Sequence, residues 1–409
     1  MQALTFEFNL ARLATAKMLG SISPSGHLSR LGPLRLREVP DATLRGEEWV
    51  VVAPRLSGIC GSDVKEAFLE GAIDNPIAGL VSFPHVMGHE LTGAVVEAGA
   101  ASGFSTGDRV VVYPWLTCET RGLPLCPACA AGQFPNCWSV TEEPFGPGMH
   151  LGTSASVSGG FAPLVPAHRS MCIRVPDGVS DEAAVLADPV AVAFHAVLKA
   201  PPEPGDRVLV IGCGALGMAA IQICSRLFDG AEVWAHDKHD YLASTITGFG
   251  ADRYVTGSSE ALIAEAGSAL GAKVFTPPRG MPYLQGGFDK VYDTVGSAGS
   301  LELAIRIARA HGTVVVPGVA TPKRFEWTPL YMKDLAVIGS NSAGIETFEG
   351  RRVHAFAEYL DLVAAGRLDL GSMITHTFAL AEYRDAFLTA RQKVAARSIK
   401  VVFEFPPLG

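Results

Sequence analysis

The chain contains a cysteine, a histidine and a glutamate placed where they could bind one metal ion. Cys60 stands in a Gly-Ile-Cys-Gly-Ser-Asp turn after a strand expected at 50–57, while His89 and Glu90 directly precede an apolar run that ends at Val96. Zinc prefers such thiolate, imidazole and carboxylate ligands, and a catalytic zinc keeps one position open. Taken singly, Cys60 also fits a small buried hydrophobe and His89 a hydrogen-bonded turn histidine.

Asp188 is the best candidate for a third ligand of that metal. It lies in the sequence Ala-Asp-Pro-Val, where Pro189 would stiffen the turn that holds the carboxylate. Because residues 191–200 resemble an apolar helix, Asp188 could instead cap the N-terminus of that helix. His195, inside the same apolar run, has the surroundings of a packed structural histidine, so we do not expect it to bind the metal.

Four of the eight cysteines fall within one short stretch, residues 113–140. They are Cys118, Cys126, Cys129 and Cys137. Four thiolates with Cys-x-x-Cys at their centre can enclose a tetrahedral structural zinc, which replaces the hydrophobic core that such a loop lacks. The alternative is a set of free thiols, which would leave the loop open to oxidation. The spacing therefore predicts a second, structural metal site.

A glycine-rich turn follows the apolar strand expected at 208–211. Its Gly-x-Gly-x-x-Gly pattern permits a tight reversal, a close approach of the backbone to a pyrophosphate, and close packing of the next helix on the strand. The residues expected to bind the cofactor through this turn are Gly212, Gly214, Ala215, Leu216 and Gly217.

Asp237 closes the next apolar run, twenty residues after Gly217. An acidic residue there accepts hydrogen bonds from an adenosine ribose and repels a 2′-phosphate, so the pattern favours NAD over NADP. Two other interpretations compete, namely a membrane span over 208–225 and a glycine turn without a ligand. The glycine spacing, Gln222 and Arg226 argue against the span, and Asp237 argues against an empty turn.

The composition excludes several classes of protein. At 409 residues the chain exceeds the size at which a single core stops growing, so we expect two domains. The formal net charge is −8 and the basic residues are dispersed, which argues against nucleic-acid binding because phosphates require a positive stripe. No signal peptide is expected, since Glu7 interrupts the first residues, and the expected compartment is the cytoplasm.

Strands and helices alternate after Val208, which predicts an α/β fold with a doubly wound parallel sheet. The strands expected in it are 208–211, 233–237, 290–294, 312–317 and 335–339. Near the end, 351–365 is expected as a helix and 374–378 and 398–405 as strands. Two stretches look like insertions, 9–31 and 273–287. The first contains a helix-like piece, and it could be a lid, a subunit contact or a solvated loop.

Together these features resemble the zinc-dependent medium-chain alcohol dehydrogenases. The matching segments, besides the four-cysteine lobe and the glycine turn with Asp237, are 58–63, 88–90, 107–110, 188–189, 293–296 and 398–402. The resemblance implies a GroES-like, β-rich catalytic domain that is split around a Rossmann domain, and a homodimer or homotetramer. The implied divisions are 1–190 and 346–409 for the catalytic domain and 191–345 for the NAD-binding domain.

By the same resemblance, Cys60, His89 and Asp188 hold the catalytic zinc, with Glu90 as a nearby or alternative ligand. Asp63 would orient His89 from behind. A carboxylate followed by proline is more similar to the polyol and threonine dehydrogenase branch than to the liver-type enzymes. With the four cysteines holding a structural zinc, the expected cofactors are two Zn²⁺ ions and NAD.

The implied activity is oxidation of a small-molecule alcohol, with a secondary alcohol preferred, to the ketone or aldehyde. The metal acidifies the alcohol, the proton leaves through Ser62, and hydride passes to NAD. The alternatives are a zinc-free quinone or enone reductase of the same superfamily, and a nucleotide-binding member that has lost catalysis. The metal-ligand set argues against the reductase, and this set together with Ser62 argues against loss of catalysis.

Two departures from the family pattern stand out. Seven residues separate Cys118 from Cys126, where the family usually has two, so Cys118 is the least certain ligand of the lobe. The family often has a histidine five residues after the catalytic cysteine as the outer end of a proton relay, and Lys65 stands there instead. Either this lysine or bulk water must then carry the proton away.

Overall fold

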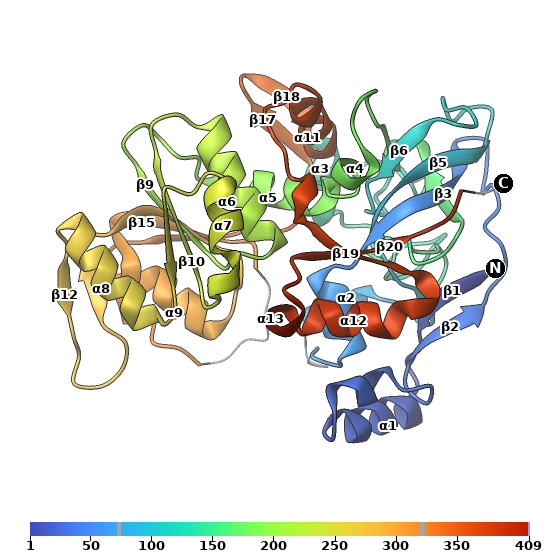
Figure 1. Ribbon diagram of the computed structural model, residues 1–409. Helices are drawn as coiled ribbons and strands as arrows, with labels where there is room; N and C mark the ends of the chain where they lie inside the picture. The colour runs from blue at the N-terminus through green and yellow to red at the C-terminus, as the bar shows by residue number, and fades with distance from the viewer. Residues whose placement is uncertain (72–74, 319–323, 408–409) are drawn as a thin grey trace. The chain divides into compact units, whose positions relative to one another are not determined.

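The computed structural model describes residues 1–71, 75–318 and 324–407, and the chain divides into two compact units (Figure 1). The first unit comprises 1–188, 356–364 and 371–409, and the second comprises 189–355 and 365–370. The chain therefore leaves the first unit after Asp188 and returns to it near its end. We call these units the outer unit and the inserted unit.

A seven-stranded sheet forms the centre of the outer unit. Its longest strand, β3, begins with consecutive buried valines, Val50 to Val52, and runs antiparallel to β5. The sheet order is β19-β20-β3-β5-β6-β8, and β7 pairs with β3 outside this path. The strands are β3 (Trp49–Gly58), β5 (Glu90–Ala98), β6 (Arg109–Val112), β7 (Val165–His168), β8 (Cys172–Arg174), β19 (Ile374–Ala379) and β20 (Lys400–Glu404).

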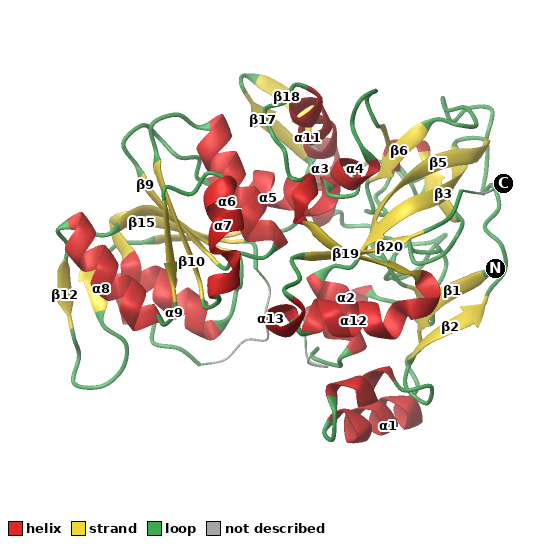
Figure 2. Cartoon of the chain, in the orientation of Figure 1, coloured by secondary structure: helices red, strands yellow, loops and turns green. Residues whose placement is uncertain are grey.

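The C-terminal strand joins this sheet beside the N-terminal half of the chain. β20 pairs antiparallel with β3, with Val402 opposite Gly58, and parallel with β19. The predicted final strand therefore finds its partner more than 300 residues upstream, and Figure 2 shows β3, β5 and β6 in the same sheet. Behind it, Phe161, Phe387 and Phe403 pack together in the core.

A smaller sheet carries the first insertion. β1 (Gln2–Phe6) pairs antiparallel with β2 (Leu34–Glu38), as the alternating pattern predicts, and β4 (His85–Val86) pairs with β1. Between β1 and β2 the insertion forms α1 (Leu10–Gly20), which Asn9 caps, and a 3₁₀ turn (Pro24–Leu28). Arg384 on α12 (Tyr383–Arg391) donates from Nε to the carbonyl of Leu28 at 2.8 Å, which ties the insertion to the unit.

A parallel six-stranded sheet forms the inserted unit, in the order β11-β10-β9-β14-β15-β16. All five strand pairs are parallel, as predicted for a doubly wound fold, and the order reverses beside β9. The strands are β9 (Arg207–Ile211), β10 (Glu232–Asp237), β11 (Arg253–Thr256), β14 (Phe288–Asp293), β15 (Ala308–Val316) and β16 (Ala336–Gly339).

Helices connect these strands, and the second predicted insertion forms a hairpin. The connecting helices are α5 (Ala187–Lys199), α6 (Ala215–Leu227), α7 (Ala243–Gly248), α8 (Ser259–Leu270), α9 (Ala298–Ile307) and α10 (Thr328–Met332). Residues 273–287 form an antiparallel hairpin, β12 (Lys273–Phe275) with β13 (Tyr283–Gln285). Within the described parts of the chain, no helix is both long and apolar enough to span a membrane.

The helix predicted over 351–365 is wrong in its first turn. Residues Arg351–His354 form β18, which pairs antiparallel with β17 (Ile345–Phe348), and α11 covers only Ala355–Ala364. Glu349 and Gly350 have positive φ angles of 49° and 75°, which reverses the chain into a tight hairpin before the helix begins. The apolar spacing continues into β18, so periodicity alone could not locate the boundary.

Candidate functional site

The outer unit brings three predicted metal ligands together. One ligand atom each from Cys60, His89 and Glu90 lies within 4.8 Å of the others, and His89 and Glu90 are buried. A thiolate, an imidazole and a carboxylate at this separation match the donor set and spacing that zinc takes in proteins. The residues therefore fit a metal ion, and three protein ligands leave a position for a substrate oxygen.

Local structure at the end of β3 fixes Cys60. It is the N-cap of the short helix α2 (Gly61–Ala67), and its backbone N–H donates to the Asp63 carboxylate at 2.8 Å. The other Asp63 oxygen, Oδ1, lies 3.6 Å from His89 Nδ1. Burial raises the pKa of Asp63 to about 6, against the lowering effect of His89. Asp63 thus links the cysteine turn to the histidine, as the resemblance implies for an orienting carboxylate.

A glycine with an unusual backbone places His89. Gly88 has φ +91°, and a Cβ there would meet the ring of Phe161. Burial lowers the pKa of His89, but the Asp63 and Cys60 charges outweigh it and raise the value well above the ordinary one. The negative groups that favour a protonated His89 would also attract a metal cation to this place.

Glu90 is paired with a lysine that our sequence analysis missed. Lys400 on β20 forms an ion pair with Glu90 Oε2, and its Nζ also donates to the carbonyl of Ile59 at 3.1 Å. Both side chains are buried, with 4% and 2% exposed. A lone lysine in the apolar stretch Ile-Lys-Val-Val-Phe was the available signal, since an unpaired charge is not tolerated in a central strand.

Asp188 lies near this group but not within it. It is the second residue of α5 and not part of a separate turn as predicted, because Pro189 is tolerated in the first turn of a helix. Burial raises the pKa of the Asp188 carboxyl to about 7, Glu90 raises it further, and His89 opposes the shift. Its carboxylate is outside the three-ligand group within 4.8 Å. Asp188 is therefore coupled electrostatically to His89 and Glu90 without joining their group.

Ser62 and Lys65 occupy the surface of α2 next to Cys60. Ser62 is exposed, and Lys65, one turn later, is half-buried. Burial lowers the pKa of the Lys65 ammonium, while the Cys60 charge opposes that shift. Residues three apart on a helix share a face, so the two side chains start from the same face of α2.

His150 is a second residue that the sequence did not reveal. Its ring centroid lies 4.8 Å from that of His89 and 5.4 Å from that of Trp115. Burial and the neighbouring His89 lower the pKa of His150 to about 3, so it is uncharged at neutral pH. No sequence pattern marked it, because it lies 61 residues after His89 in an irregular loop.

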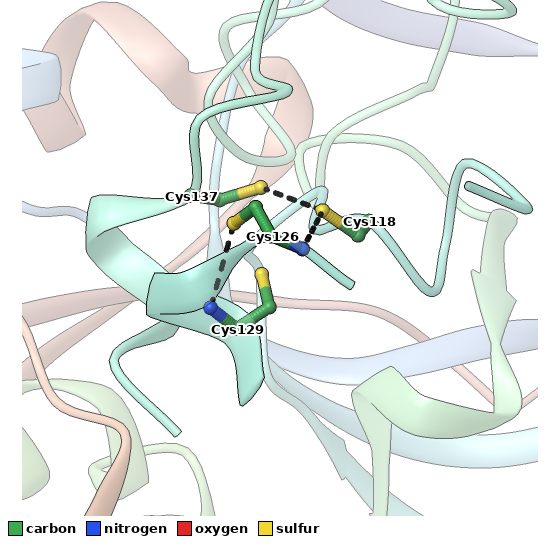
Figure 3. A group of neighbouring side chains, drawn as sticks. All are labelled: Cys118, Cys126, Cys129 and Cys137. Carbon is green, nitrogen blue, oxygen red and sulfur yellow. Dashed lines mark hydrogen bonds between the residues drawn. The ribbon is translucent and has the colours of Figure 1, made fainter. Parts of the chain in front are cut away.

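The four lobe cysteines also come together (Figure 3). Their sulfur atoms lie within 4.8 Å of one another, and all four are free of disulfides. The Cys118 and Cys137 sulfurs are 3.6 Å apart, and Cys118 accepts the Cys126 N–H at 3.4 Å. Cys118 therefore lies next to the other three cysteines despite the seven residues before Cys126. The intervening residues form a turn, and α3 (Pro127–Ala130) places Cys126 and Cys129 beside Cys118.

Backbone N–H groups stabilise the thiolate form of one lobe cysteine, Cys126, whereas burial raises the pKa of Cys129 and Cys137. Burial would raise the pKa of Cys126, but the N–H groups of Trp138 and Cys129, each 3.5 Å from its sulfur, lower it to about 6. Four sulfurs within 4.8 Å of one another, three of which accept backbone N–H groups, fit a structural zinc.

Arg121 cross-links the lobe through hydrogen bonds, and the sequence had not indicated this role. Its buried guanidinium donates to the carbonyls of Leu116 (3.2 Å), Val140 (3.0 Å), Gly146 (3.1 Å) and Gly148 (2.8 Å), and also to that of Glu142. Five carbonyls converging on one cation replace the regular hydrogen bonding that this irregular loop lacks.

The glycine turn of the inserted unit has the expected backbone. Gly212 has φ +87°, and a Cβ on Gly217 would overlap the Gly212 carbonyl oxygen. Gly214 is the N-cap of α6, so Ala215 and Leu216 provide the first backbone N–H groups of that helix. Asp237, at the end of β10, accepts the Cys213 N–H at 2.7 Å. The turn and the acidic residue are thus neighbours at the carboxyl end of the parallel sheet, where such folds bind nucleotides.

Comparison with known proteins agrees with this arrangement. A family model described as alcohol dehydrogenase GroES-like domain matches residues 46–177, and one described as zinc-binding dehydrogenase matches 215–364. L-galactonate-5-dehydrogenase of Escherichia coli is 26% identical over 86% of this chain and 89% of its own length. Sorbitol dehydrogenase of Bacillus subtilis is 24% identical over 88% and 91%.

Solved structures share the fold. Galactitol-1-phosphate dehydrogenase from Escherichia coli superposes with a TM-score of 0.73 at 22% identity, covering 99% of this chain and 100% of that one. Two others carry a coenzyme. A zinc-binding dehydrogenase from Sinorhizobium meliloti was solved with NADP (TM-score 0.71, 24% identity, 98% and 100% covered), and acetophenone reductase from Geotrichum candidum with NAD (0.72, 21%, 99% and 97%).

A GroES-like unit with a zinc-type ligand set and an inserted Rossmann unit define a zinc-binding, nicotinamide-dependent dehydrogenase. The chain belongs to the zinc-dependent medium-chain dehydrogenase family, in its polyol dehydrogenase branch. The predicted family, fold class and cofactors, zinc and a nicotinamide dinucleotide, are thereby confirmed. The protein is an oxidoreductase acting on CH–OH groups, and the comparisons give no support to a zinc-free reductase.

Proposed function

We propose that the protein oxidises a secondary hydroxyl of a polyol or hydroxy-acid substrate to the ketone, with NAD as coenzyme. The cluster of Cys60, His89 and Glu90 carries this proposal, because it offers a metal three protein ligands and one open position. Relatives named for sorbitol and L-galactonate support the substrate class. The outer unit would then be the catalytic domain and the inserted unit the coenzyme-binding domain.

In this proposal the three ligands hold the catalytic zinc, and Asp188 reduces the net positive charge beside it. When bound, zinc acts as a Lewis acid on the substrate oxygen and the nicotinamide accepts hydride. Ser62, exposed two residues after Cys60, accepts the hydroxyl proton as its own hydroxyl proton passes outward. Lys65, three residues later on α2, takes the place of a relay histidine: its amine, having released one proton to water, accepts the proton that Ser62 gives up.

The coenzyme preference rests on Asp237. Asp237 is the last residue of β10, and its carboxylate accepts the Cys213 N–H. This hydrogen bond holds the carboxylate where a ribose would bind. A 2′-phosphate would bring two negative charges against it. We therefore propose NAD rather than NADP.

The assembly we propose is a homodimer through β16. This strand ends the six-stranded sheet, so among the described strands its outer edge has no partner. Trp327, Tyr331 and Met332, at and beside α10, are exposed at 66%, 83% and 57%, and Val337 on β16 at 41%. Exposed apolar side chains beside an open strand edge suit a second copy of the same surface. For the compartment we propose the cytoplasm, because all eight cysteines are free.

The test combines metal content with turnover. Purified protein should hold about two zinc ions per chain, one for each cluster, and should oxidise members of a panel of pentitols, hexitols and sugar acids with NAD. Cys60→Ala should lose one zinc ion and all turnover while still binding NADH. Cys172→Ala, which removes a buried thiol outside both clusters, is the matched control and should keep both. A Cys60→Ala protein that retains turnover would contradict the assignment.

A further inference from the structure

His150 stands directly beside the candidate metal ligands, although it is not one of them. Its ring centroid is 4.8 Å from that of His89, yet it does not join the three ligand atoms that lie within 4.8 Å of one another. It belongs to the loop that follows the cysteine lobe. A polar side chain at this place needs a chemical explanation, since a packed apolar residue would serve structure alone.

The loop that carries His150 is held firmly. The His150 backbone N–H donates to Thr153 Oγ1 at 3.1 Å, and Oγ1 donates back to the His150 carbonyl at 2.7 Å. A β-bridge joins His150 to Trp115, and a Cβ on Gly152, which has φ +83°, would lie 3.0 Å from the backbone nitrogen of Gly88. The turn after His150 therefore packs against the loop that positions His89.

One hydrogen bond decides which ring nitrogen of His150 is available. Nδ1 lies 2.5 Å from the carbonyl oxygen of Leu151, and a carbonyl can only accept, so Nδ1 carries the proton. In the uncharged ring Nε2 then presents a lone pair. Among the described residues none is a hydrogen-bond partner of Nε2. Nε2 is also absent from the set of buried polar atoms that lack a partner, so part of its surface reaches solvent. It is an accessible acceptor on a ring whose centroid lies 4.8 Å from that of His89.

We propose that His150 Nε2 accepts a hydrogen bond from a second hydroxyl of the substrate, on the carbon next to the one that is oxidised. This inference rests on the proposed function and gives it a chemical criterion, since the site then selects vicinal diols and polyols over simple alcohols. A substrate without that hydroxyl covers the acceptor without pairing with it, which weakens binding in the ground and transition states alike.

The experiment compares matched substrates that differ by one hydroxyl. The pairs are butane-2,3-diol with butan-2-ol and cyclohexane-1,2-diol with cyclohexanol. Wild-type protein should show a higher kcat/KM for the diol of a pair, and His150→Phe should lower this preference about tenfold or more while changing kcat/KM for the simple alcohol only a few-fold. His150→Gln, whose amide oxygen can accept a hydrogen bond, should restore part of the preference.

Zinc per chain is measured in each variant, because it separates substrate contact from metal binding. Unchanged zinc with a lost diol preference supports the proposal. Loss of a zinc ion in His150→Phe would make His150 a ligand and overturn it, and so would an unchanged diol preference in that variant. A wild-type protein that oxidises both members of each pair equally well overturns this inference alone. One that oxidises no alcohol of these pairs or of the polyol panel overturns the proposed function and this inference together.

Discussion

Replacing Lys400 by methionine tests whether its ammonium neutralises Glu90. The two side chains form an ion pair with only 4% and 2% of their surfaces exposed. Burial disfavours the charged lysine and is the largest single effect, but the Glu90 carboxylate together with the Cys60 and Asp188 charges outweighs it and raises the pKa of Lys400. The protonated lysine therefore contributes its full share of the stabilisation below the unfolded pKa, near 10.4, and that share is lost as the pH rises through the raised folded value. The pair also requires an ionised Glu90 carboxylate, so the measurement is made near neutral pH.

Methionine keeps the length of the side chain and removes its charge, so the cavity is filled while Glu90 is left buried without its partner. Removing one partner of a buried ion pair costs about 3–5 kcal/mol. We expect this loss for Lys400→Met in urea unfolding at pH 7.5. In a Glu90→Gln background the same change should cost about 2 kcal/mol less, because no carboxylate remains to be neutralised.

Two controls define the result. Lys290→Met removes a partly exposed lysine 3.8 Å from Asp206 and should cost less than about 1 kcal/mol. Zinc per chain is measured alongside, since Glu90 released from Lys400 could bind the metal more tightly and offset part of the loss. Additive effects of Lys400→Met and Glu90→Gln would refute the reasoning, as would a loss for Lys400→Met no larger than that for Lys290→Met.

Two further predictions concern the coenzyme and the lobe. Asp237→Ser should raise the ratio of kcat/KM with NADP to that with NAD by about tenfold or more, because the carboxylate that repels a 2′-phosphate is gone; Asp240→Ser, an exposed neighbour, should leave the ratio unchanged, and an unchanged ratio in Asp237→Ser would contradict the prediction. Arg121→Lys cannot reach the five carbonyls that the guanidinium bonds, so it should destabilise the protein by about 3 kcal/mol and speed zinc loss to a chelator. The exposed substitution Arg174→Lys should change neither quantity, and equal zinc-release rates for Arg121→Lys and wild type would count against a cross-linking role for Arg121.

Features that depend on neighbouring residues could be predicted from the sequence. The strand ending at Ile211, the turn with positive φ at Gly212 and the helix from Ala215 follow from one short stretch. The Cys-x-x-Cys pair likewise lies on one turn of α3, where Pro127 fits the first helical position. Strong local rules of this kind indicated the two-unit fold and its family before any long-range contact was known.

The boundary near residue 351 shows where such rules fail. Apolar spacing favoured a helix through 351–365, but two positive φ angles and pairing with β17 make 351–354 a strand. Gly350 was the one local signal of this reversal, but a glutamate precedes it where a tight hairpin turn usually has asparagine, aspartate or glycine, so the turn was not predicted.

The sequence by itself determined the ligand chemistry of this protein, because the thiolate of Cys60 and the imidazole of His89 are groups whose metal preference is known from the residue type. Only the tertiary structure decided which groups face them. Lys400 reaches Glu90 because β20 pairs with β3 across more than 300 residues, and His150 reaches His89 because its loop packs on Gly88. Strand pairing and loop packing join residues that are far apart in the chain, and no spacing rule along the sequence contains that information.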